Sequence, residues 1–510
     1  MTPVPVAGRA IAWSSMDVAG AQELLLHGCE DCACAVSTGE PHAPTEGLPD
    51  TTDARNWVRG AGLVDIALDA DHRLLFNPVG RGGVAVVNEP AHQLLRCFER
   101  PTTLTAVRAG WSGGAGEFQR VVSRLNQADL IHPDGQPPMP AFGGGQMLTA
   151  WLHVSNACNL RCPYCYVSKS AEGMDERTGR AAVEAVIRSA VRHGFPAVKL
   201  KYAGGEASLN RLVMMHMHAH ARALTARAGL DLHATLLSNG TALAPGLIAE
   251  LKAESIPVMI SLDGVGAQHD IQRPTIAGKP SFQLVERGIR RLMEQSHPPH
   301  LSITVTNRNA GGLAEAVRFA LERDLTFSLN FFRDNDCAAS FPDLRYQEET
   351  MISAILDAFA VIEESLPRWS VLGSVLDRGQ LLEPRQRSCG VGEDYLVIDQ
   401  RGRVAKCHME IERTLGDIFI ADPLLLVRQD TATVRNLPVE EKEGCRDCAW
   451  RYWCSGGCAV ATFRATGRYD IKSPNCNIYK AVYPQALRLE GLRILRYAPS
   501  DPRDTAPTTS

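Results

Sequence analysis

Three closely spaced cysteines, Cys158, Cys162 and Cys165, stand in the sequence Cys-Asn-Leu-Arg-Cys-Pro-Tyr-Cys. Thiolates are the usual ligands of a four-iron, four-sulfur cluster, and three of them leave one iron without a protein ligand. An open iron can bind a small molecule and reduce it. Zinc is the alternative, but zinc sites usually pair Cys-x-x-Cys units with further ligands, and none follows closely here. The spacing therefore predicts an iron–sulfur cluster with one open position.

Two further motifs follow this cysteine loop, each at the end of an expected β-strand. In Ala203-Gly-Gly-Glu206, the glycines allow the backbone to approach a ligand closely, and Glu206 can accept hydrogen bonds from an ammonium group. Ser261-Leu-Asp-Gly264 is followed by Arg273, whose planar guanidinium suits bidentate pairing with a carboxylate. Each motif alone could be an ordinary turn or strand end. Their order behind the cysteine loop favours a functional role.

Seven more cysteines lie near the C-terminus. Twelve residues separate Cys389 from Gly402, and four separate Gly402 from Cys407. The other five are Cys445, Cys448, Cys454, Cys458 and Cys476. The chain has 15 cysteines and no secretory signal pattern, which favours metal or cluster chemistry in a reducing cytoplasm over disulfides. Two zinc ribbons are the alternative interpretation, since zinc also uses paired Cys-x-x-Cys units.

Strand-like and helix-like segments alternate between residues 148 and 375. The expected strands are Leu148–Val154, Val198–Tyr202, Leu232–Leu237, Val258–Leu262, Leu301–Thr306 and Thr326–Phe331, and the expected helices include Arg180–His193 and Leu209–Arg227. Repeated strand–helix units predict an α/β domain with a parallel sheet covered by helices. Ligand loops of such barrels lie at the C-terminal ends of the strands. The cysteine loop and the later motifs occupy these ends, and so does Ser-Asn-Gly at Ser238 and Asn239.

The N-terminal part of the chain is harder to assign. In residues 1–60, Cys29, Cys32 and Cys34 form a weak candidate metal site without a fourth ligand. Residues 61–133 contain three short strand-like segments followed by three amphipathic helices, a pattern that predicts a winged-helix-like domain. The strands are expected at Leu63–Leu68, Arg73–Pro78 and Val84–Asn88, and the first helix directly after Asn88.

Composition excludes several classes of protein. The chain has 510 residues and a net charge of −4, so no basic surface predicts nucleic-acid binding. No apolar run approaches the length of about 18 residues that a membrane span needs. We therefore expect a cytoplasmic protein of about three domains, with neither nucleic acid nor membrane as a partner.

The cysteine loop, with Tyr164 before its last cysteine, resembles that of the radical S-adenosylmethionine (SAM) enzymes. The resemblance implies that the open iron chelates SAM and that an electron from the cluster cleaves SAM to a 5′-deoxyadenosyl radical. It also implies an α/β fold with a partial (β/α)6 barrel. The residues that it assigns to SAM binding are Tyr164, Gly204, Gly205, Glu206, Ser238, Asn239, Ser261, Asp263 and Arg273. Ala207 departs from the family, which often has Pro after Gly-Gly-Glu.

The seven C-terminal cysteines resemble the SPASM domain, which is appended to radical SAM enzymes that modify peptides and carries two auxiliary four-iron clusters. The implied ligands are Cys445, Cys448, Cys454 and Cys476 for one cluster, and Cys389, Cys407 and Cys458 for the other. The second set lacks a fourth thiol. Cys337, His408 and a substrate thiolate are the candidates for that position.

The residue after Cys407 bears on the reaction. In the sulfatase-maturating branch of the family, an Asp follows the equivalent cysteine and acts as the base for formylglycine formation, whereas this chain has His408. Histidine can take a proton near neutral pH, so His408 is the candidate catalytic residue. The change from Asp lowers the expectation of formylglycine formation.

Residues 61–133 resemble the peptide-chaperone family of pyrroloquinoline quinone biosynthesis, whose members bind the leader of a precursor peptide as an added edge strand. The full prediction is a radical SAM/SPASM maturase with three four-iron clusters and SAM, which crosslinks a ribosomally made precursor peptide at an unactivated carbon. A reductase, flavodoxin or ferredoxin would supply electrons. The alternatives are maturation of formylglycine or of a peptide-derived cofactor, and a non-enzymatic zinc-binding scaffold.

The expected domain boundaries follow from these resemblances. They are 1–60, of unclear role; 61–133, winged-helix-like and peptide-binding; 146–375, the radical SAM core; 376–485, the SPASM domain; and 486–510, a C-terminal tail.

Overall fold

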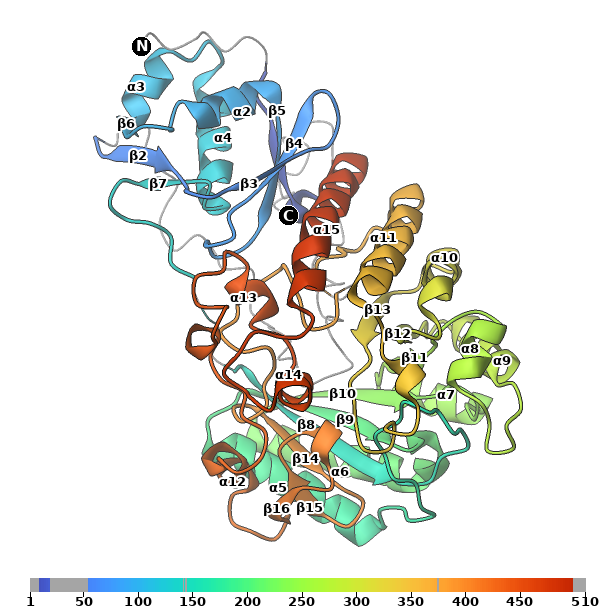
Figure 1. Cartoon of the computed structure of the whole chain (residues 1–510). Helices are drawn as coiled ribbons and strands as arrows, with labels where there is room; N and C mark the ends of the chain where they lie inside the picture. The colour runs from blue at the N-terminus through green and yellow to red at the C-terminus, as the bar shows by residue number, and fades with distance from the viewer. Residues whose placement is uncertain (1–8, 19–53, 141, 143–144, 374–375, 499–510) are drawn as a thin grey trace.

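The computed structural model describes residues 9–18, 54–140, 142, 145–373 and 376–498. Figure 1 shows an N-terminal lobe, drawn in blue, at one end of the molecule and a large α/β body at the other. The long C-terminal helix α15 (Cys476–Tyr497) lies between the lobe and the body. Cys29, Cys32 and Cys34 lie outside the described residues, so the metal site considered there stays a prediction.

A nine-stranded sheet with the order β13-β12-β11-β10-β9-β8-β14-β15-β16 forms the body. Strands β8 to β13 run parallel and follow one another across the sheet, which confirms the expected α/β fold with a parallel sheet. Their bounds are β8 (Met147–Ser155), β9 (Ala197–Gly204), β10 (Asp231–Ser238), β11 (Val258–Ser261), β12 (His300–Val305) and β13 (Phe327–Phe331). All residues of β8 are buried, as expected for a parallel strand covered on both faces.

Helices connect these strands and bury one face of the sheet (Figure 1). They are α5 (Glu176–Arg192), α6 (Arg211–Ala228), α7 (Pro245–Ala253), α8 (Ala267–Gln272), α9 (Phe282–Glu294), α10 (Leu313–Leu321) and α11 (Glu348–Glu364). Asp175 begins α5 by accepting a hydrogen bond from the backbone N–H of Thr178 (2.7 Å), a typical N-cap.

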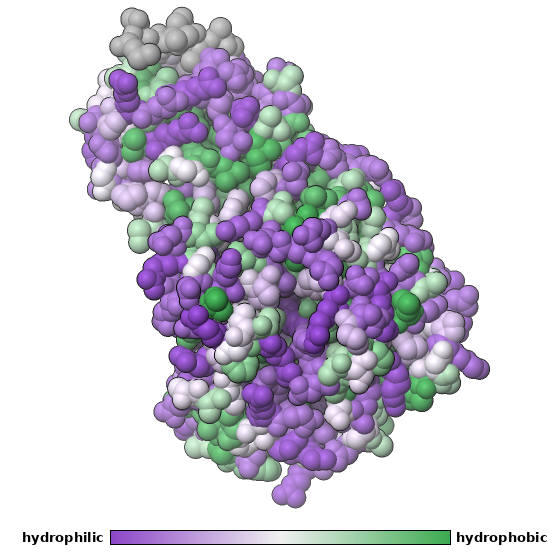
Figure 2. Space-filling model, in the orientation of Figure 1, coloured by the Kyte–Doolittle hydropathy of each residue, from purple (hydrophilic) through white to green (hydrophobic). Residues whose placement is uncertain are grey.

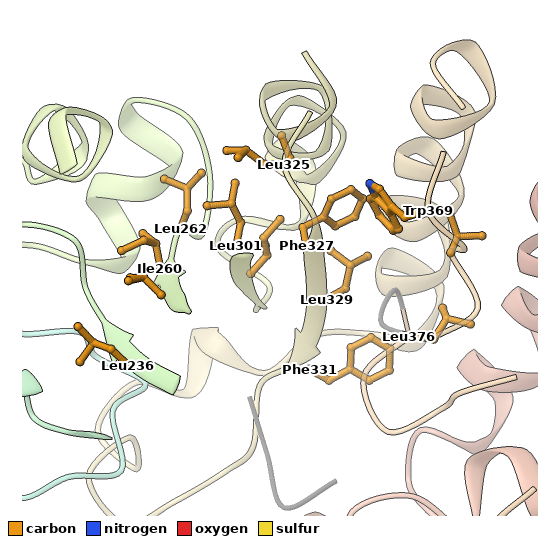
Figure 3. Close-up of a cluster of buried hydrophobic side chains, with 14 of the residues drawn as sticks. Leu236, Ile260, Leu262, Leu301, Leu325, Phe327, Leu329, Phe331, Trp369 and Leu376 are labelled. Atoms are coloured by element: carbon orange, nitrogen blue, oxygen red, sulfur yellow. The ribbon is translucent and has the colours of Figure 1, made fainter. Parts of the chain in front are cut away.

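Apolar side chains of neighbouring strands make one continuous core, of which Figure 3 shows a part. Ile260 of β11, Leu301 of β12 and Phe327 of β13 lie side by side there, all less than 1% exposed. Trp369 packs edge-on against Phe327, with ring centroids 5.4 Å apart. This rigid core fixes the strand ends from which the candidate site residues project.

A strand from the cysteine-rich region joins the barrel sheet, a feature that the sequence analysis did not predict. β14 (Tyr395–Ile398) pairs in parallel with β8, and β15 (Arg403–Ala405) and β16 (Thr414–Asp417) extend the sheet in antiparallel fashion. The remaining helices of this region are α12 (Pro423–Gln429), α13 (Arg451–Cys454) and α14 (Ala459–Thr466). The cysteine-rich region is therefore hydrogen-bonded, through β14, to β8, the strand that leads into the first cysteine loop.

The tail expected at 486–510 is helical as far as Tyr497. Helix α15 continues through Pro484 without ending, although a proline removes one backbone hydrogen bond from a helix interior. Burial explains this: α15 packs against α11 and against the N-terminal lobe, and its Glu490 and Arg493 form an ion pair with both side chains 0% exposed. Packing energy outweighs the local cost of the proline.

The described residues of the N-terminal lobe form two small antiparallel sheets and the helices α2, α3 and α4. The strands β3 (Val64–Ala67), β4 (His72–Phe76) and β5 (Val84–Asn88) lie close to the expected ranges, and β1 (Ala12–Ser14) completes the order β1-β5-β4-β3. The second sheet is β6-β2-β7, formed by β6 (Thr102–Thr103), β2 (Asn56–Arg59) and β7 (Ile131–Pro133). The helices are α2 (Glu89–Arg96), α3 (Leu104–Ala109) and α4 (Ala115–Gln127). Strands β1 and β2 come from residues to which no role was assigned.

The lobe contacts the cysteine-rich region through aromatic side chains. Trp453 is fully buried, and its indole N–H donates to the carbonyl oxygen of Pro78 (2.8 Å). Phe76 packs against Trp453 and Trp450, with ring centroids 4.8 and 6.0 Å away. Trp453 directly precedes Cys454, so the lobe contacts the side chain next to a candidate cluster ligand.

The face drawn in Figure 2 is mostly hydrophilic, with hydrophobic atoms gathered in small separate groups. Across the described ranges, no helix has both the length and the apolar character that crossing a membrane demands.

Candidate functional site

The cysteine loop begins where β8 ends and is held by the end of β9. The backbone N–H of Gly205 donates to the carbonyl oxygen of Ser155 (2.6 Å), and that of Glu206 to the carbonyl oxygen of Ala157 (2.8 Å). A Cβ atom on Gly205 would lie 2.5 Å from the Ala157 oxygen. The glycines were expected to admit a ligand, but in the structure the close neighbour is the backbone that leads into Cys158.

This close contact gives a first testable consequence. Gly205→Ala must push the backbone of the cysteine loop away, which we expect to cost about 1–3 kcal/mol, as overpacking typically does. Iron bound per chain after anaerobic reconstitution should fall, together with the thermal midpoint. Gly311→Ala is the matched control, because nothing lies within 4 Å of a Cβ atom at that position. Equal iron content in the two variants would contradict the assigned role of Gly205.

Glu206 joins the ends of β9 and β10 through three hydrogen bonds and is 2% exposed. Its carboxylate accepts from the hydroxyl of Ser238 (2.8 Å) and from the backbone N–H groups of Asn239 (2.6 Å) and Ser208 (3.1 Å). The Asn239 amide in turn donates to Asn159 (2.8 Å), which lies inside the cysteine loop. The structure thus brings together three of the predicted SAM-binding residues beside the loop. A carboxylate has about four acceptor sites, so Glu206 retains capacity for one further donor.

Arg273 forms a second buried group with Tyr164 and Asp263. The Tyr164 hydroxyl donates to Asp263 (2.5 Å) and accepts from the Arg273 guanidinium, which also lies 3.4 Å from Asp263. Asp263 is fixed further by the backbone N–H of Thr304 (2.9 Å). Arg273 is 8% exposed, and its Nε has no hydrogen-bond partner among the described residues. An unpartnered buried N–H is costly, so this nitrogen fits a site for an acceptor such as a carboxylate.

Burial dominates the electrostatics of the loop. It raises the pKa of Cys162 to about 11, although the nearby Arg273 cation acts in the opposite direction. Burial also raises the pKa of Cys158 and that of Asp263, the latter against the effect of Arg273. Such thiols are protonated without a metal, and a bound metal deprotonates them, so cluster binding would release protons.

No three His, Cys, Asp or Glu side chains converge on a single metal-ion position in the part of the chain that the structure describes. A four-iron cluster makes a different demand, because each thiolate ligates a different iron atom. The three thiols of the loop fit that demand in type and in number. They also lie close together, because Cys158 and Cys162 are each within electrostatic range of Cys165.

The seven C-terminal cysteines fall into two spatial groups with the membership that the family resemblance implied. The first, group A, consists of Cys445, Cys448, Cys454 and Cys476, whose thiols influence one another electrostatically. The second, group B, consists of Cys389, Cys407 and Cys458. Lys442 is 1% exposed and lies near thiols of both groups, with its ammonium donating to the Ser455 carbonyl oxygen (2.9 Å). A cation at this place offsets part of the charge that bound clusters would bring.

Group B has cationic neighbours. Burial raises the pKa of Cys458, but the guanidinium groups of Arg333 and Arg378 outweigh it, and the net effect is a lowered pKa. Cys407 has no such neighbour of equal strength, and burial together with the other two thiols raises its pKa. Cys458 therefore loses its proton more readily than Cys407.

Cys337 lies at the first cysteine loop. Its thiol contacts the carbonyl oxygen of Tyr166 (3.7 Å) and lies within electrostatic range of Cys165, whereas the thiols of group B are not among its neighbours of this kind. The loop after β13 carries Cys337 to the first cysteine loop, a placement that spacing alone did not reveal. Its role as the fourth ligand of group B stays a prediction.

His408 lies in a box of aromatic side chains and is 6% exposed. It stacks on Trp151 of β8 (centroids 4.5 Å apart) and contacts Tyr166 edge-on, while its Nδ1 lies 3.0 Å from the Tyr395 hydroxyl. Its position next to Cys407 and Tyr166 places it between the group B thiols and the first cysteine loop. Ser261 is the last residue of β11 and lies two positions before Asp263 in the sequence.

The sequence analysis missed two residues that shape this site. Tyr166 follows Cys165 directly and contacts His408. Its position next to a candidate cluster ligand could have identified it as a site residue. Asn335 donates to the carbonyl oxygen of Tyr164 (3.0 Å) from the loop after β13. It follows the last parallel strand, where ligand loops are expected.

Comparisons with known proteins agree with this geometry. Residues 152–320 match the family model of the Radical SAM superfamily. This part of the chain, which carries the cysteine loop, Glu206 and Arg273, is a radical SAM domain.

The relatives include a sulfatase-maturating enzyme and a peptide cyclase. A cysteine-type anaerobic sulfatase-maturating enzyme of Clostridium perfringens is 22% identical over 337 residues, which cover 60% of this chain and 86% of that protein. A PqqA peptide cyclase of Xanthomonas campestris pv. campestris is 23% identical over 351 residues, covering 64% and 86%. An uncharacterized protein of Methanocaldococcus jannaschii is 28% identical over 171 residues, which cover 33% of this chain and 57% of its own length.

Among solved structures, native anSMEcpe with bound AdoMet and Cp18Cys peptide superposes with a TM-score of 0.56 and 18% sequence identity. The match covers 69% of this chain and 99% of that chain. At this identity the likeness establishes a shared fold.

Proposed function

We propose that the protein is a radical SAM maturase that cleaves SAM and crosslinks a ribosomally made precursor peptide at an unactivated carbon. The observation that carries the proposal is the buried Arg273 guanidinium beside Cys162, with its Nε unpartnered, at the C-terminal ends of the parallel strands. A cation that can bind a carboxylate thus lies next to three thiols that suit an open four-iron cluster. The methionine end of SAM carries a carboxylate for the cation and groups that an open iron can bind.

The bound cluster and SAM supply the radical chemistry, and the chain binds, orients and shields them. Cys158, Cys162 and Cys165 would hold the cluster. Arg273 would pair with the SAM carboxylate, and Glu206 would accept from its ammonium group through its remaining acceptor site. Asp263 and Tyr164 fix the guanidinium before SAM arrives, which lowers the entropy cost of binding.

We further propose auxiliary clusters on groups A and B. Four thiols can complete the cluster of group A, and three leave one position of the group B cluster to a ligand other than cysteine. His408 lies beside group B and is a candidate for proton transfer or for that position. Electrons would come from a reductase, flavodoxin or ferredoxin.

A peptide substrate is supported by the names of the relatives and by the N-terminal lobe. A small antiparallel sheet with an outer strand can bind an extended peptide by adding it as a further strand. The lobe contacts the cysteine-rich region through Trp453, so a peptide held on the lobe would remain tethered to the enzyme body.

Formylglycine formation is the second candidate, favoured by the match to the sulfatase-maturating enzyme over 86% of its length. Against it, His408 stands in an aromatic box at the position where that branch of the family has its Asp base.

Two measurements test the proposal. Anaerobically reconstituted protein, given SAM and dithionite, should release 5′-deoxyadenosine and methionine. Neighbouring reading frames are searched for short peptides, and co-expression with the true precursor should yield a peptide that has lost two hydrogens per crosslink, without an aldehyde that a hydrazide probe can capture. Aldehyde formation would support the second candidate, and protein that is colourless and binds zinc would overturn both.

A further inference from the structure

Residues 9–18 contact the N-terminal lobe as an added strand. β1 pairs antiparallel with β5, with Ala12 opposite Val87 and Ser14 opposite Ala85. Residues 19–53 separate this segment from β2 in the sequence. Without β1, the side of β5 that faces away from β4 would be an outer edge with unpaired backbone groups, of the kind to which extended peptides bind.

Polar side chains of the lobe contact this segment along its length. Glu117 of α4 accepts from the backbone N–H of Ala10 (2.7 Å), and Asn88 accepts from that of Ile11 (2.9 Å). At the other end, Arg124 of α4 pairs with the carboxylate of Asp17 (2.5 Å). Backbone recognition at one end and charge recognition at the other give the segment a fixed direction in the groove between β5 and α4.

Side chains of the segment alternate between two environments. Ala10 and Ala12 are 4% and 5% exposed and lie in the core beneath the helices of the lobe, where a larger side chain would have to displace buried neighbours. Trp13 is 7% exposed and packs into the other core, on the side of α15. The groove therefore accommodates a specific sequence pattern. It has two small residues at alternate positions (Ala10 and Ala12), an aromatic residue directly after them (Trp13), and an acidic residue four positions further on (Asp17).

We propose that residues 9–18 are an intramolecular competitor, a resident strand that occupies the groove between β5 and α4 until a segment of the substrate peptide with the same pattern replaces it. The inference rests on the proposed peptide substrate and assigns it to this groove. Among the described residues, no strand pairs with the outer edge of β3, at the opposite side of the same sheet.

The resident strand is coupled to the cysteine-rich region. The hydroxyl of Ser15 donates to Glu490 (2.9 Å), which pairs with Arg493 on α15. Helix α15 begins at Cys476, a thiol of group A. Replacement of the resident strand by a peptide therefore changes a contact of the helix that carries a candidate cluster ligand.

A tethered strand competes with a free peptide at an effective concentration of about millimolar. A substitution that displaces the tethered strand should therefore increase the protein's affinity for a free peptide of the same sequence. The probe is a fluorescein-labelled synthetic peptide of residues 9–18, measured by fluorescence anisotropy with the full-length, reconstituted protein. Ala12→Arg removes the small side chain that fits beside α4, and we expect it to bind the probe about ten- to a hundredfold more tightly than the wild type.

Ala67→Arg is the matched control, because Ala67 lies exposed on the edge strand β3. It should bind the probe as weakly as the wild type. If Ala67→Arg in combination with Ala12→Arg abolishes binding, the peptide uses the β3 edge, and the proposed groove is wrong. If Ala12→Arg keeps its thermal midpoint and gains no affinity, β1 is an ordinary structural strand.

A charge exchange keeps the inference testable if Ala12→Arg misfolds. Protein with Arg124→Asp should bind a probe carrying Asp17→Arg at least tenfold more tightly than the unmodified probe, because the carboxylate and the guanidinium have exchanged places. Equal affinity for both probes would overturn the assignment of Arg124. None of these measurements needs SAM turnover, so a failure here with normal 5′-deoxyadenosine release overturns this inference alone. Normal probe binding without 5′-deoxyadenosine overturns the proposed function instead.

Discussion

Replacing Cys158, Cys162 and Cys165 together by Ala is expected to abolish 5′-deoxyadenosine release and to remove about four irons per chain. Two short backbone hydrogen bonds, from Gly205 and Glu206, hold the loop that carries them, and the Cys158 thiol adds only longer contacts from Leu160 (3.4 Å) and Asn239 (3.8 Å). The variant should therefore fold normally and keep the clusters proposed for groups A and B. Its absorbance near 400 nm should fall by about one third, if three clusters are present in the wild type.

The matched control is Cys97→Ala, which removes a half-buried thiol of the N-terminal lobe that belongs to none of the three sets. Its iron content and turnover should equal those of the wild type. Cys337→Ala is a second useful comparison, because Cys337 contacts Tyr166 beside the loop. We expect it to retain iron in group B. Continued release of 5′-deoxyadenosine by the triple variant would show that the radical cluster lies elsewhere.

Sequence reasoning succeeded where buried elements and chemical motifs coincide. Strands such as β8 are continuous apolar runs, since both faces are covered, and motif residues follow directly at their C-terminal ends. That coincidence predicted the six parallel strands and placed Glu206, Ser238 and Asn239 at neighbouring strand ends. The division of the seven cysteines into two ligand sets came from family resemblance and not from spacing, and it stays a prediction.

The remaining features depend on contacts between distant parts of the chain. β1 has only three residues, and its stability comes from β5, Glu117 and Arg124, none of which is near it in sequence. Helix α15 continues beyond Pro484 because the residues after the proline are buried against the rest of the protein. The helix-breaking tendency of proline alone would predict an end there. Cys337 was associated with group B because that group lacked a thiol, whereas the loop after β13 carries it to the first cysteine loop.

The second large effect is expected at Arg273. Arg273→Ala should weaken SAM binding about ten- to a hundredfold, because loss of a charge-assisted contact costs about 1.5–3 kcal/mol. Arg273→Lys should recover little of it, since an ammonium cannot reproduce the planar guanidinium that contacts Tyr164 and Asp263 while presenting Nε. Equilibrium dialysis with radiolabelled SAM measures the affinity without turnover, and iron content should stay at the wild-type level in both variants.

Glu206 requires a different substitution, because its carboxylate has structural and proposed binding roles together. Glu206→Ala would leave the buried donors of Ser238, Asn239 and Ser208 without an acceptor, so a loss of SAM affinity could reflect local unfolding. Glu206→Gln keeps the shape of the side chain but removes the charge that an ammonium group needs. We expect it to lower SAM affinity about tenfold with a thermal midpoint close to that of the wild type, whereas Glu206→Ala should lower both. If Glu206→Gln and Arg273→Ala both bind SAM normally, the ammonium and carboxylate of SAM contact other residues, and the proposed pocket is wrong even if the cysteine loop holds the cluster.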